Sequence, residues 1–212
     1  RATRCCGAAP PGAEYCDYQT HQVHRYASAQ ELERAHPPAP GTVRVVCVSD
    51  THLAEAELDV PCGDVLVHCG DWDWLGHWKG PRSRRDLAAF GAWLRAQPCT
   101  HKVVVAGNHD AICERLGPWE VQAVLAAGDP HVQYLQDSEA RLFVRGHVLQ
   151  VHGSPASLTH AGSRNAAFVR DSEDALAVHW CTRVPSDADV VVTHQPLWEH
   201  EGGVVRHFAG LA

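Results

Sequence analysis

The fold is indicated first by the segment Val43-Arg-Val-Val-Cys-Val-Ser-Asp-Thr-His52. Five of its first six residues are apolar and four are valine, which is typical of a short strand buried on both faces of a sheet. The strand ends in Ser-Asp-Thr-His, and in open α/β sheets the carboxyl ends of the strands border the ligand-binding crevice. Asp50 and His52 are two residues apart, so we expect them to point the same way and to chelate one metal ion.

Three later segments repeat this pattern of an apolar strand followed by a polar cluster. They are Asp64-Val-Leu-Val-His-Cys-Gly-Asp71, Lys102-Val-Val-Val-Ala-Gly-Asn-His-Asp110 and Asp189-Val-Val-Val-Thr-His194. Gly70 allows the backbone to turn tightly before Asp71. We therefore expect Asp71 to reach the same edge of the sheet as Asp50.

The remaining pattern predicts helices and a second sheet. Residues 141–152 read as a hairpin that turns at Arg145-Gly146, and such an antiparallel pair suggests a second sheet packed behind the first. A further strand is expected at 132–137. Apolar spacing and end signals predict helices at 28–35, capped by Ser28, and at 83–97, 118–127 and 172–180.

Length and composition indicate one folded α/β domain. The chain has 212 residues, of which 45% are hydrophobic and 20% are charged, values ordinary for a globular domain. The segment Pro37-Pro-Ala-Pro-Gly41 cannot continue a helix, so we divide the chain into a partly flexible leader, 1–40, and a domain, 41–212. The chain starts with Arg and contains no Met, which leads us to expect a fragment or a processed form.

Charge and cysteine content narrow the partners and the compartment. The formal net charge of −7 argues against binding long nucleic acids, although a small phosphate ester still fits if metal ions supply positive charge. No apolar run reaches about 18 residues, so no membrane span is expected. The nine cysteines show no paired spacing, which predicts reduced thiols and a cytoplasmic protein. The alternative is a small metal knuckle of Cys5, Cys6 and Cys16.

The polar clusters together offer two carboxylates, two imidazoles and one amide oxygen. Such a mixed nitrogen and oxygen set suits manganese, iron or zinc better than magnesium or calcium. Asp71 is the natural candidate to bridge two ions roughly 3.5–4 Å apart, an arrangement that clamps a phosphate. A single Asp after a strand is usually a cap or turn former, so the inference depends on the whole set: Asp50, His52, Asp71, Asn108 and His194.

Four of these blocks resemble, in order and spacing, the signature of the calcineurin-like metallophosphoesterases: Asp50-x-His52, Gly70-Asp71, Gly107-Asn108-His109-Asp110 and Thr193-His194. Val48–His52, Tyr134–Glu139 and Gly153-Ser-Pro155 are similar to the small metallophosphoesterase-domain-containing subgroup. The resemblance covers roughly residues 43–196. It implies a two-sheet α/β/β/α sandwich and a site for two divalent ions, with manganese expected and iron or zinc as alternatives.

The resemblance also implies roles for individual residues. Asp50 and His52 would hold the first ion, Asp71 would bridge, and Asn108 and His194 would hold the second. Asn108 would also contact the phosphate, and His109 would act as general acid or stabilise the developing charge. The implied catalytic residues are thus His109, Asp71 and Asn108. The implied function is a hydrolase of small phosphodiesters or phosphomonoesters, with nucleotides among the candidate substrates.

The chain departs from the family pattern after His194. Only 18 residues follow, whereas the family continues to a Gly-rich turn with a further His. We therefore expect the last strands of the sandwich to be missing, and the final ligand to be lost or replaced by His200 or His207. Two alternatives follow: a catalytically weak or inactive nucleotide- or metal-binding regulatory protein with the same fold, or a truncated product with an open sheet edge. The sequence makes no prediction of oligomeric state.

Residues beside the blocks have plainer interpretations. We expect His68 and His101 to be surface or packing residues, and His152 to line the pocket. Asp73 and Asp110 are expected to be turn formers or to support the ligands. Three tryptophans are expected to form core or a wall of the site: Trp72, Trp74 and Trp78.

Overall fold

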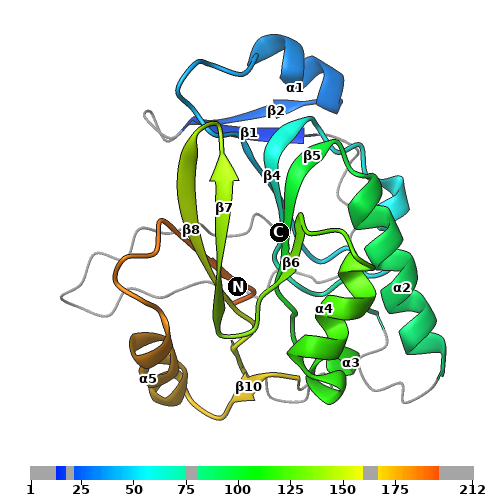
Figure 1. Ribbon diagram of the computed structural model, residues 1–212, viewed down its shortest axis with the longest axis vertical. Helices are drawn as coiled ribbons and strands as arrows, with labels where there is room; N and C mark the ends of the chain where they lie inside the picture. The colour runs from blue at the N-terminus through cyan, green and yellow to red at the C-terminus, as the bar shows by residue number, and fades with distance from the viewer. Residues whose placement is uncertain (1–12, 18–21, 75–80, 160–166, 196–212) are drawn as a thin grey trace.

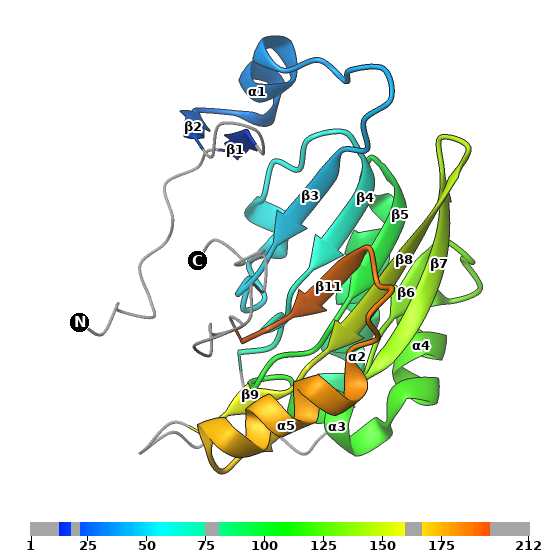
Figure 2. The same ribbon diagram turned by 90° about the vertical axis from the view of Figure 1, so that its left-hand side faces the viewer.

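The computed structural model describes residues 13–17, 22–74, 81–159 and 167–195. In these residues two β-sheets pack face to face, with α2 and α4 outside one sheet and α5 outside the other (Figures 1 and 2). This arrangement confirms the expected α/β/β/α sandwich. The described residues do not include Trp78, His200 or His207. The expectation that the last strands of the sandwich are missing also concerns residues outside this part and stays a prediction.

The first sheet is parallel, with the strand order β3-β4-β5-β6. Its strands are β3 (Val45–Val48), β4 (Gly63–His68), β5 (Cys99–Val104) and β6 (Val132–Tyr134). The expectation that β3 is buried on both faces is wrong, because Val45 is 39% exposed. Among the described strands β3 forms one edge of this sheet, whereas β4 and β5 lie inside it and are largely buried.

Helices cover one face of the first sheet (Figure 1). They are α2 (Pro81–Ala96), α3 (Ala111–Leu116) and α4 (Pro118–Ala126), with the short 3₁₀ turn η1 (Glu55–Glu57) joining β3 to β4. Leu87, Phe90 and Leu94 of α2 are fully buried, as their helical spacing predicted. They form one core with Val121 and Leu125 of α4.

The second sheet has the order β11-β8-β7. It consists of β7 (Ser138–Val144), β8 (His147–Ser154) and β11 (Val190–Thr193). The predicted hairpin is confirmed, since β7 and β8 pair antiparallel around Arg145 and Gly146, both with positive φ. Strand β11 runs parallel to β8. Val192 and Val151 pack with Val67 and Val103 of the first sheet in the core between the sheets.

The outer face of the second sheet is covered by α5 (Glu173–Arg183), which begins at the cap residue Ser172. Buried Leu176 and Trp180 of α5 pack against Ala156. Two short parallel strands, β9 (Ser157–Leu158) and β10 (Val169–Arg170), lie at this end of the sandwich. They connect the second sheet to α5.

The leader contains more regular structure than we expected. Strands β1 (Ala13–Asp17) and β2 (Gln22–Tyr26) form an antiparallel hairpin that the sequence pattern did not predict. Helix α1 (Ala29–Ala35) is confirmed, and the hydroxyl of Ser28 accepts a hydrogen bond from the Glu31 N–H at 3.2 Å. The boundary at residue 40 stays a prediction. Within the described residues, every helix is too short or too polar to cross a membrane.

Candidate metal centre

The loops that follow β3 and β4 are joined by backbone hydrogen bonds. The N–H groups of Asp50 and His52 donate to the carbonyl oxygens of Gly70 and Asp71, at 3.0 and 3.1 Å. Asp50, His52 and Asp71 all have positive φ, at 56°, 47° and 57°. This backbone conformation is costly for residues other than glycine and concentrates at functional sites, where the surroundings hold it. The joined loops therefore fix three polar side chains beside one another.

Together with His109 and His194, these side chains form two groups, and both groups include the carboxylate of Asp71. Asp71 lies with Asp50 and His194 in one group and with His52 and His109 in the other, and the ligand atoms within each group lie within 4.8 Å of one another. Asp71 is buried and central, as expected of a bridging residue. The grouping divides Asp50 from His52, although we expected them to hold one ion together. The turn in the backbone at both residues ends the strand-like alternation on which that expectation depended, and the assignment of residues to ions stays a prediction.

The orientation of two histidine rings leaves one nitrogen of each available to a metal. Nδ1 of His194 lies 2.9 Å from the Cys69 carbonyl oxygen, and Nδ1 of His52 lies 3.0 Å from the Asp73 carbonyl oxygen. A carbonyl only accepts, so Nδ1 donates in both rings, and Nε2 of each neutral ring carries a lone pair. Metal-ligating histidines characteristically use their second nitrogen in this way.

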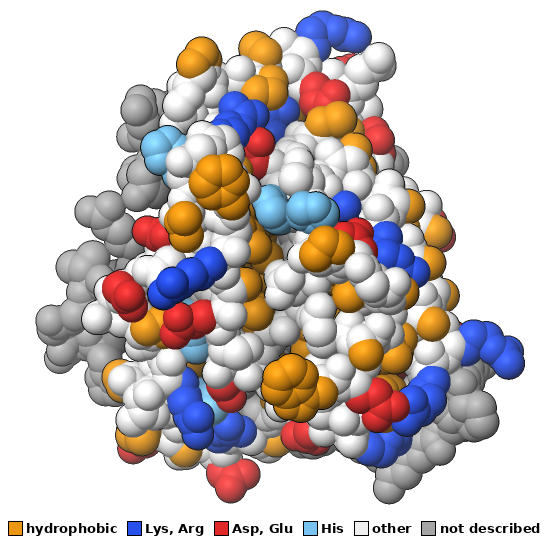
Figure 3. All heavy atoms as spheres, in the orientation of Figure 1, with side chains coloured by type: hydrophobic (Ala, Val, Ile, Leu, Met, Phe, Trp, Pro, Cys, Tyr) orange, Lys and Arg blue, Asp and Glu red, His pale blue; other side chains and the backbone are white. Residues whose placement is uncertain are grey.

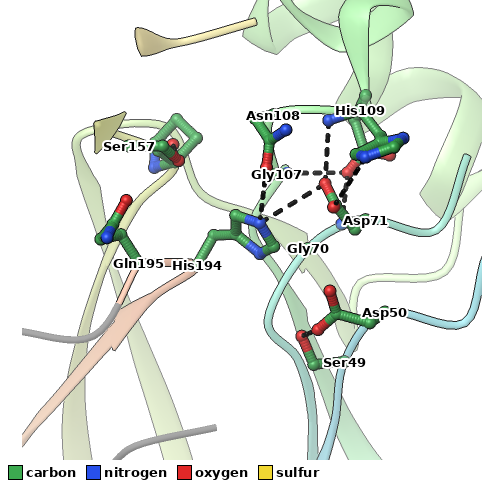
Figure 4. Close-up of polar contacts among 12 residues, drawn as sticks. Ser49, Asp50, Gly70, Asp71, Gly107, Asn108, His109, Ser157, His194 and Gln195 are labelled. Atoms are coloured by element: carbon green, nitrogen blue, oxygen red, sulfur yellow. Dashed lines mark hydrogen bonds and ion pairs between the residues drawn. The ribbon is translucent and has the colours of Figure 1, made fainter. Parts of the chain in front are cut away.

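Acceptor atoms converge around Nε2 of His194 (Figure 4). This nitrogen lies 3.1 Å from Asn108 Oδ1 and 3.5 Å from Asp71 Oδ1. In the neutral ring, a lone pair therefore faces two oxygen atoms, which is unfavourable unless a cation lies between them. The donor set thus fits a divalent ion.

Two glycines allow this close approach. A Cβ atom on Gly107 would lie 2.1 Å from Asp71 Oδ1, and one on Gly70 would lie 2.7 Å from both Gly107 N and His194 Nδ1. Gly70 also has a φ of +106°, which side chains rarely adopt. These contacts explain why glycine precedes the polar clusters at Asp71 and Asn108.

Asp110 ties the β4 loop to the β5 loop. Its carboxylate, fully buried, accepts the N–H groups of Asp71 (2.9 Å), Asp73 (2.9 Å) and Gly107 (2.7 Å). Burial, with the nearby Asp71 carboxylate, raises the pKa of Asp110, while the hydrogen bonds from the backbone oppose that shift. The backbone of Asp71 is thereby set next to His109, whose N–H donates to Asp71 Oδ1 at 2.9 Å. Asp110 supports the ligands, as expected.

His68 supports the loop that carries Asp50 and His52. It is fully buried, its Nδ1 accepts the Gly70 N–H at 3.3 Å, and its Nε2 lies 3.1 Å from the Thr51 hydroxyl. Burial lowers the pKa of His68 to about 3, so the ring is neutral. His68 is thus a packing residue and not a surface one, and the sequence did not indicate its contact with Thr51. The sequence feature that could have indicated this role was a single histidine at the end of an apolar strand.

A second support missed in the sequence holds Asn108. The Asn108 carbonyl accepts the N–H of Ala167 at 3.2 Å, and the next N–H, of Phe168, donates to Glu114 Oε1 of α3 at 2.8 Å. Phe168 has a positive φ of 58°. The segment entering β10 is therefore held against the residue that brings the amide oxygen to the site.

Other expected neighbours take different positions. His152 pairs with Val191 on the face of the second sheet opposite Val192, which lies in the core between the sheets, so it points away from the site rather than lining it. Trp72 is fully buried and stacks on Phe90. Trp74 is 47% exposed, and its ring contacts His52 at a centroid distance of 5.0 Å.

Comparison with known proteins agrees with this geometry. The family model for calcineurin-like phosphoesterases matches residues 43–210. Human metallophosphoesterase domain-containing protein 1 is 32% identical over 182 residues, covering 76% of this chain and 50% of the relative. A UPF0046 protein of Caenorhabditis elegans is 31% identical over 180 residues, covering 76% of this chain and 54% of the relative. A probable rhamnogalacturonate lyase C of Emericella nidulans is 35% identical over 160 residues, which are 74% of this chain but 14% of that protein.

The chain therefore belongs to the calcineurin-like phosphoesterase family. This is a family of metal-dependent enzymes, and the site has a residue cluster that can hold metal. The chain spans about half the length of the human and nematode relatives, with coverage of 50% and 54%.

Proposed function

We propose that the protein hydrolyses small phosphodiesters or phosphomonoesters at a dinuclear metal site. The observation that carries the proposal is the sharing of Asp71 by two groups of ligand atoms. A carboxylate between two such groups suits two cations that act on one phosphate. The mixed nitrogen and oxygen donors favour manganese, with iron or zinc as alternatives.

The residues of the chain have separable tasks in this proposal. Asp50 and His194 on one side, and His52 on the other, join Asp71 in holding the ions. Asn108 directs its amide oxygen at the same space (Figure 4). Divalent ions held by these residues would supply positive charge for the phosphate and for activating a water.

His109 is the proposed proton donor to the leaving group. Its Nε2 lies 3.7 Å from Asp71 Oδ2, and its side chain keeps 23% of its surface exposed. The imidazole is therefore at the site and still accessible to a substrate. An imidazolium at this position can donate a proton to an alkoxide as it leaves.

The proposed partner is a small phosphate ester, with nucleotides among the candidates and long nucleic acids excluded. On the face shown in Figure 3, Lys and Arg side chains are interspersed with Asp and Glu instead of forming a continuous basic surface. Neither that face nor the net charge of −7 provides the concentrated positive charge that binds the phosphate backbone of a nucleic acid. The cytoplasmic location stays a prediction, and the family match does not favour the alternative of a regulatory protein without catalysis.

The test is turnover of a chromogenic phosphodiester and a chromogenic monoester by the metal-depleted protein, with manganese, iron or zinc added separately. We expect turnover that depends on metal and is lost with a chelator. Absence of turnover with all three metals, while calorimetry shows that metal binds, would leave a metal-binding protein and reject the catalytic proposal.

A further inference from the structure

Three aromatic rings lead from Asp71 toward the surface. The ring centroids of His109 and His52 are 4.8 Å apart, and those of His52 and Trp74 are 5.0 Å apart. The two ends of the row differ in exposure: the side chain of His109, beside Asp71, is 23% exposed, and Trp74 as a residue is 47% exposed. The row thus connects the candidate reaction centre with an open aromatic surface.

The same loop places a second tryptophan in the core. Trp72 is fully buried, and its ring is nearly parallel to that of Phe90 at 5.2 Å. Trp74, two residues later, meets His52 with the ring planes at 90° and keeps about half of its surface exposed. A large aromatic ring that stays half-exposed retains apolar surface that a ligand can cover with gain of free energy.

The position of Trp74 is also fixed by a ligand of the candidate centre. Nδ1 of His52 donates to the carbonyl oxygen of Asp73, the residue directly before Trp74. The aromatic surface is therefore held at a set place relative to His52. With His109 as the proposed proton donor, the leaving group of a bound ester would lie beside His109, at the inner end of the row that leads to Trp74.

We propose that Trp74 determines substrate specificity by stacking on a flat aromatic ring carried by the phosphate ester. The inference rests on the proposed function, because it needs a phosphate at the metal site. Two sources share this chemistry: an aryl group esterified directly to phosphate, and the base of a nucleotide, which is separated from phosphate by ribose. A competing explanation is that Trp74 only holds His52 in place, which would affect all phosphate ligands equally.

The experiment measures binding to the manganese-loaded protein by calorimetry. Phenylphosphonate and methylphosphonate, which are not hydrolysed, form one pair; AMP and ribose 5-phosphate form the other, with samples checked for hydrolysis. Stacking on an aromatic side chain predicts that the aromatic member of at least one pair binds about 5- to 150-fold more tightly. The pair that shows the difference identifies the source of the ring.

Variants distinguish a role of Trp74 in substrate specificity from a role in positioning His52. Trp74→Leu should remove the difference between the members of the pair and leave methylphosphonate binding unchanged, whereas Trp74→Phe should keep part of it. Trp119→Leu is the matched control, because Trp119 of α4 is 89% exposed and is not among the three rings of this row. It should behave as the wild type.

Every other outcome rejects the inference about Trp74, the proposed function, or both. Equal binding within both pairs, with methylphosphonate bound, rejects the aromatic inference and leaves the proposed function intact. Equal weakening of both members of a pair by Trp74→Leu assigns Trp74 to the positioning of His52 and also rejects the inference. If neither phosphonate nor either phosphate binds to the metal-loaded wild type, the proposed function fails together with the inference.

Discussion

Two clusters of polar side chains lie at the ends of the adjacent strands β11 and β8, on opposite faces of the second sheet. One is the candidate metal centre, which His194 enters from β11. The other, which we name the α5 cluster, consists of Asp137, Ser154, Arg170 and His179. Both contain carboxylate and imidazole groups, so composition alone would not separate them.

Hydrogen-bond direction separates the two clusters. In the α5 cluster Arg170 donates to Nδ1 of His179 at 3.0 Å, so Nε2 of the neutral ring donates to Asp137 Oδ1 at 2.8 Å, and Ser154 donates to the same oxygen at 2.7 Å. Donors and acceptors alternate throughout. In the metal centre, by contrast, Nδ1 of His194 donates to the Cys69 carbonyl, and Nε2 faces the side-chain oxygens of Asn108 and Asp71.

Hydrogen-bond direction therefore distinguishes a structural cluster from a binding cluster. A buried polar group is stable when it is paired, and leaving it unpaired is expensive. The α5 cluster satisfies this condition from its own residues and attaches α5 to the second sheet. In the metal centre, a neutral His194 ring meets this condition only when a cation lies between Nε2 and the facing oxygens. Four predictions test this contrast.

The largest effect is expected for Asp71→Asn. The substitution keeps the shape of the side chain and one oxygen to accept the His109 N–H, but it removes the charge shared by the two groups of ligands. Loss of groups that merely support a ligand lowers metal affinity by about 10–100-fold, so loss of the shared ligand should lower manganese affinity by more than about 100-fold. Calorimetric titration with manganese measures the affinity. Wild-type affinity in this variant would remove the basis for a bridging role.

Asp110→Ala should have a smaller effect on metal and a clear effect on folding. It leaves three buried N–H groups without their acceptor, at about 1–3 kcal/mol each before relaxation. We expect manganese affinity to fall about 10–100-fold because the backbone of Asp71 loses its support. Denaturant unfolding with chelator and manganese titration give the two quantities separately.

Asp110→Asn is the graded control for this prediction. One oxygen remains to accept from Asp71 and Gly107, while the amide NH₂ faces the Asp73 N–H. The losses of folding stability and of manganese affinity should therefore both be smaller than in Asp110→Ala. A stable Asp110→Ala protein with unchanged manganese affinity would show that the loops hold their geometry without this carboxylate.

Much of the site was predictable from sequence because strand ends and glycines are local signals. A parallel strand must deliver its last residues to one edge of the sheet, so the polar residues after β3, β4 and β5 were expected together. Gly70 and Gly107 carry the same information, since the structure leaves no room for a Cβ at either. The hairpin at Arg145-Gly146 followed from turn chemistry in the same way.

The features that the sequence did not predict depend on contacts between segments that are distant in the chain. The exposure of Val45 depends on β3 being at an edge, which the apolar pattern of a single strand does not reveal. The direction of His152 depends on its register with Val191, since a shift by one residue reverses the face. The supports from His68 and Asp110 depend on contacts between separate loops.

The third prediction concerns pH, because the metal centre rests on a histidine buried without charge. The pKa of His68 is lowered by burial from 6.5 to about 3. Between these pH values the unfolded chain holds a proton that the folded chain does not, so stability falls as pH falls, by up to about 1.4 kcal/mol per pH unit. Denaturant unfolding of the wild type and of His68→Gln at about pH 7, 6 and 5 measures the difference in slope.

His68→Gln removes the ionisable group, so its stability should fall less steeply than that of the wild type. The chelated protein is used, which keeps metal binding out of the comparison. Identical slopes in the two proteins would mean that His68 is protonated in the folded state or lies exposed to water.

The smallest effect, and the sharpest contrast with Asp71→Asn, is expected for Asp137→Asn. Asp137 has a positive φ of 49°, which Asn tolerates, so the backbone should not be further strained. The variant keeps one oxygen to accept from Ser154 or His179 but loses the charge, which should cost about 1–3 kcal/mol of unfolding free energy. Manganese affinity should stay within about twofold of wild type, because the cluster lies on the opposite face of the sheet and is already paired. A loss of metal affinity comparable to that of Asp71→Asn would mean that the two clusters act as one network through β8 and β11, and direction of hydrogen bonding would no longer distinguish them.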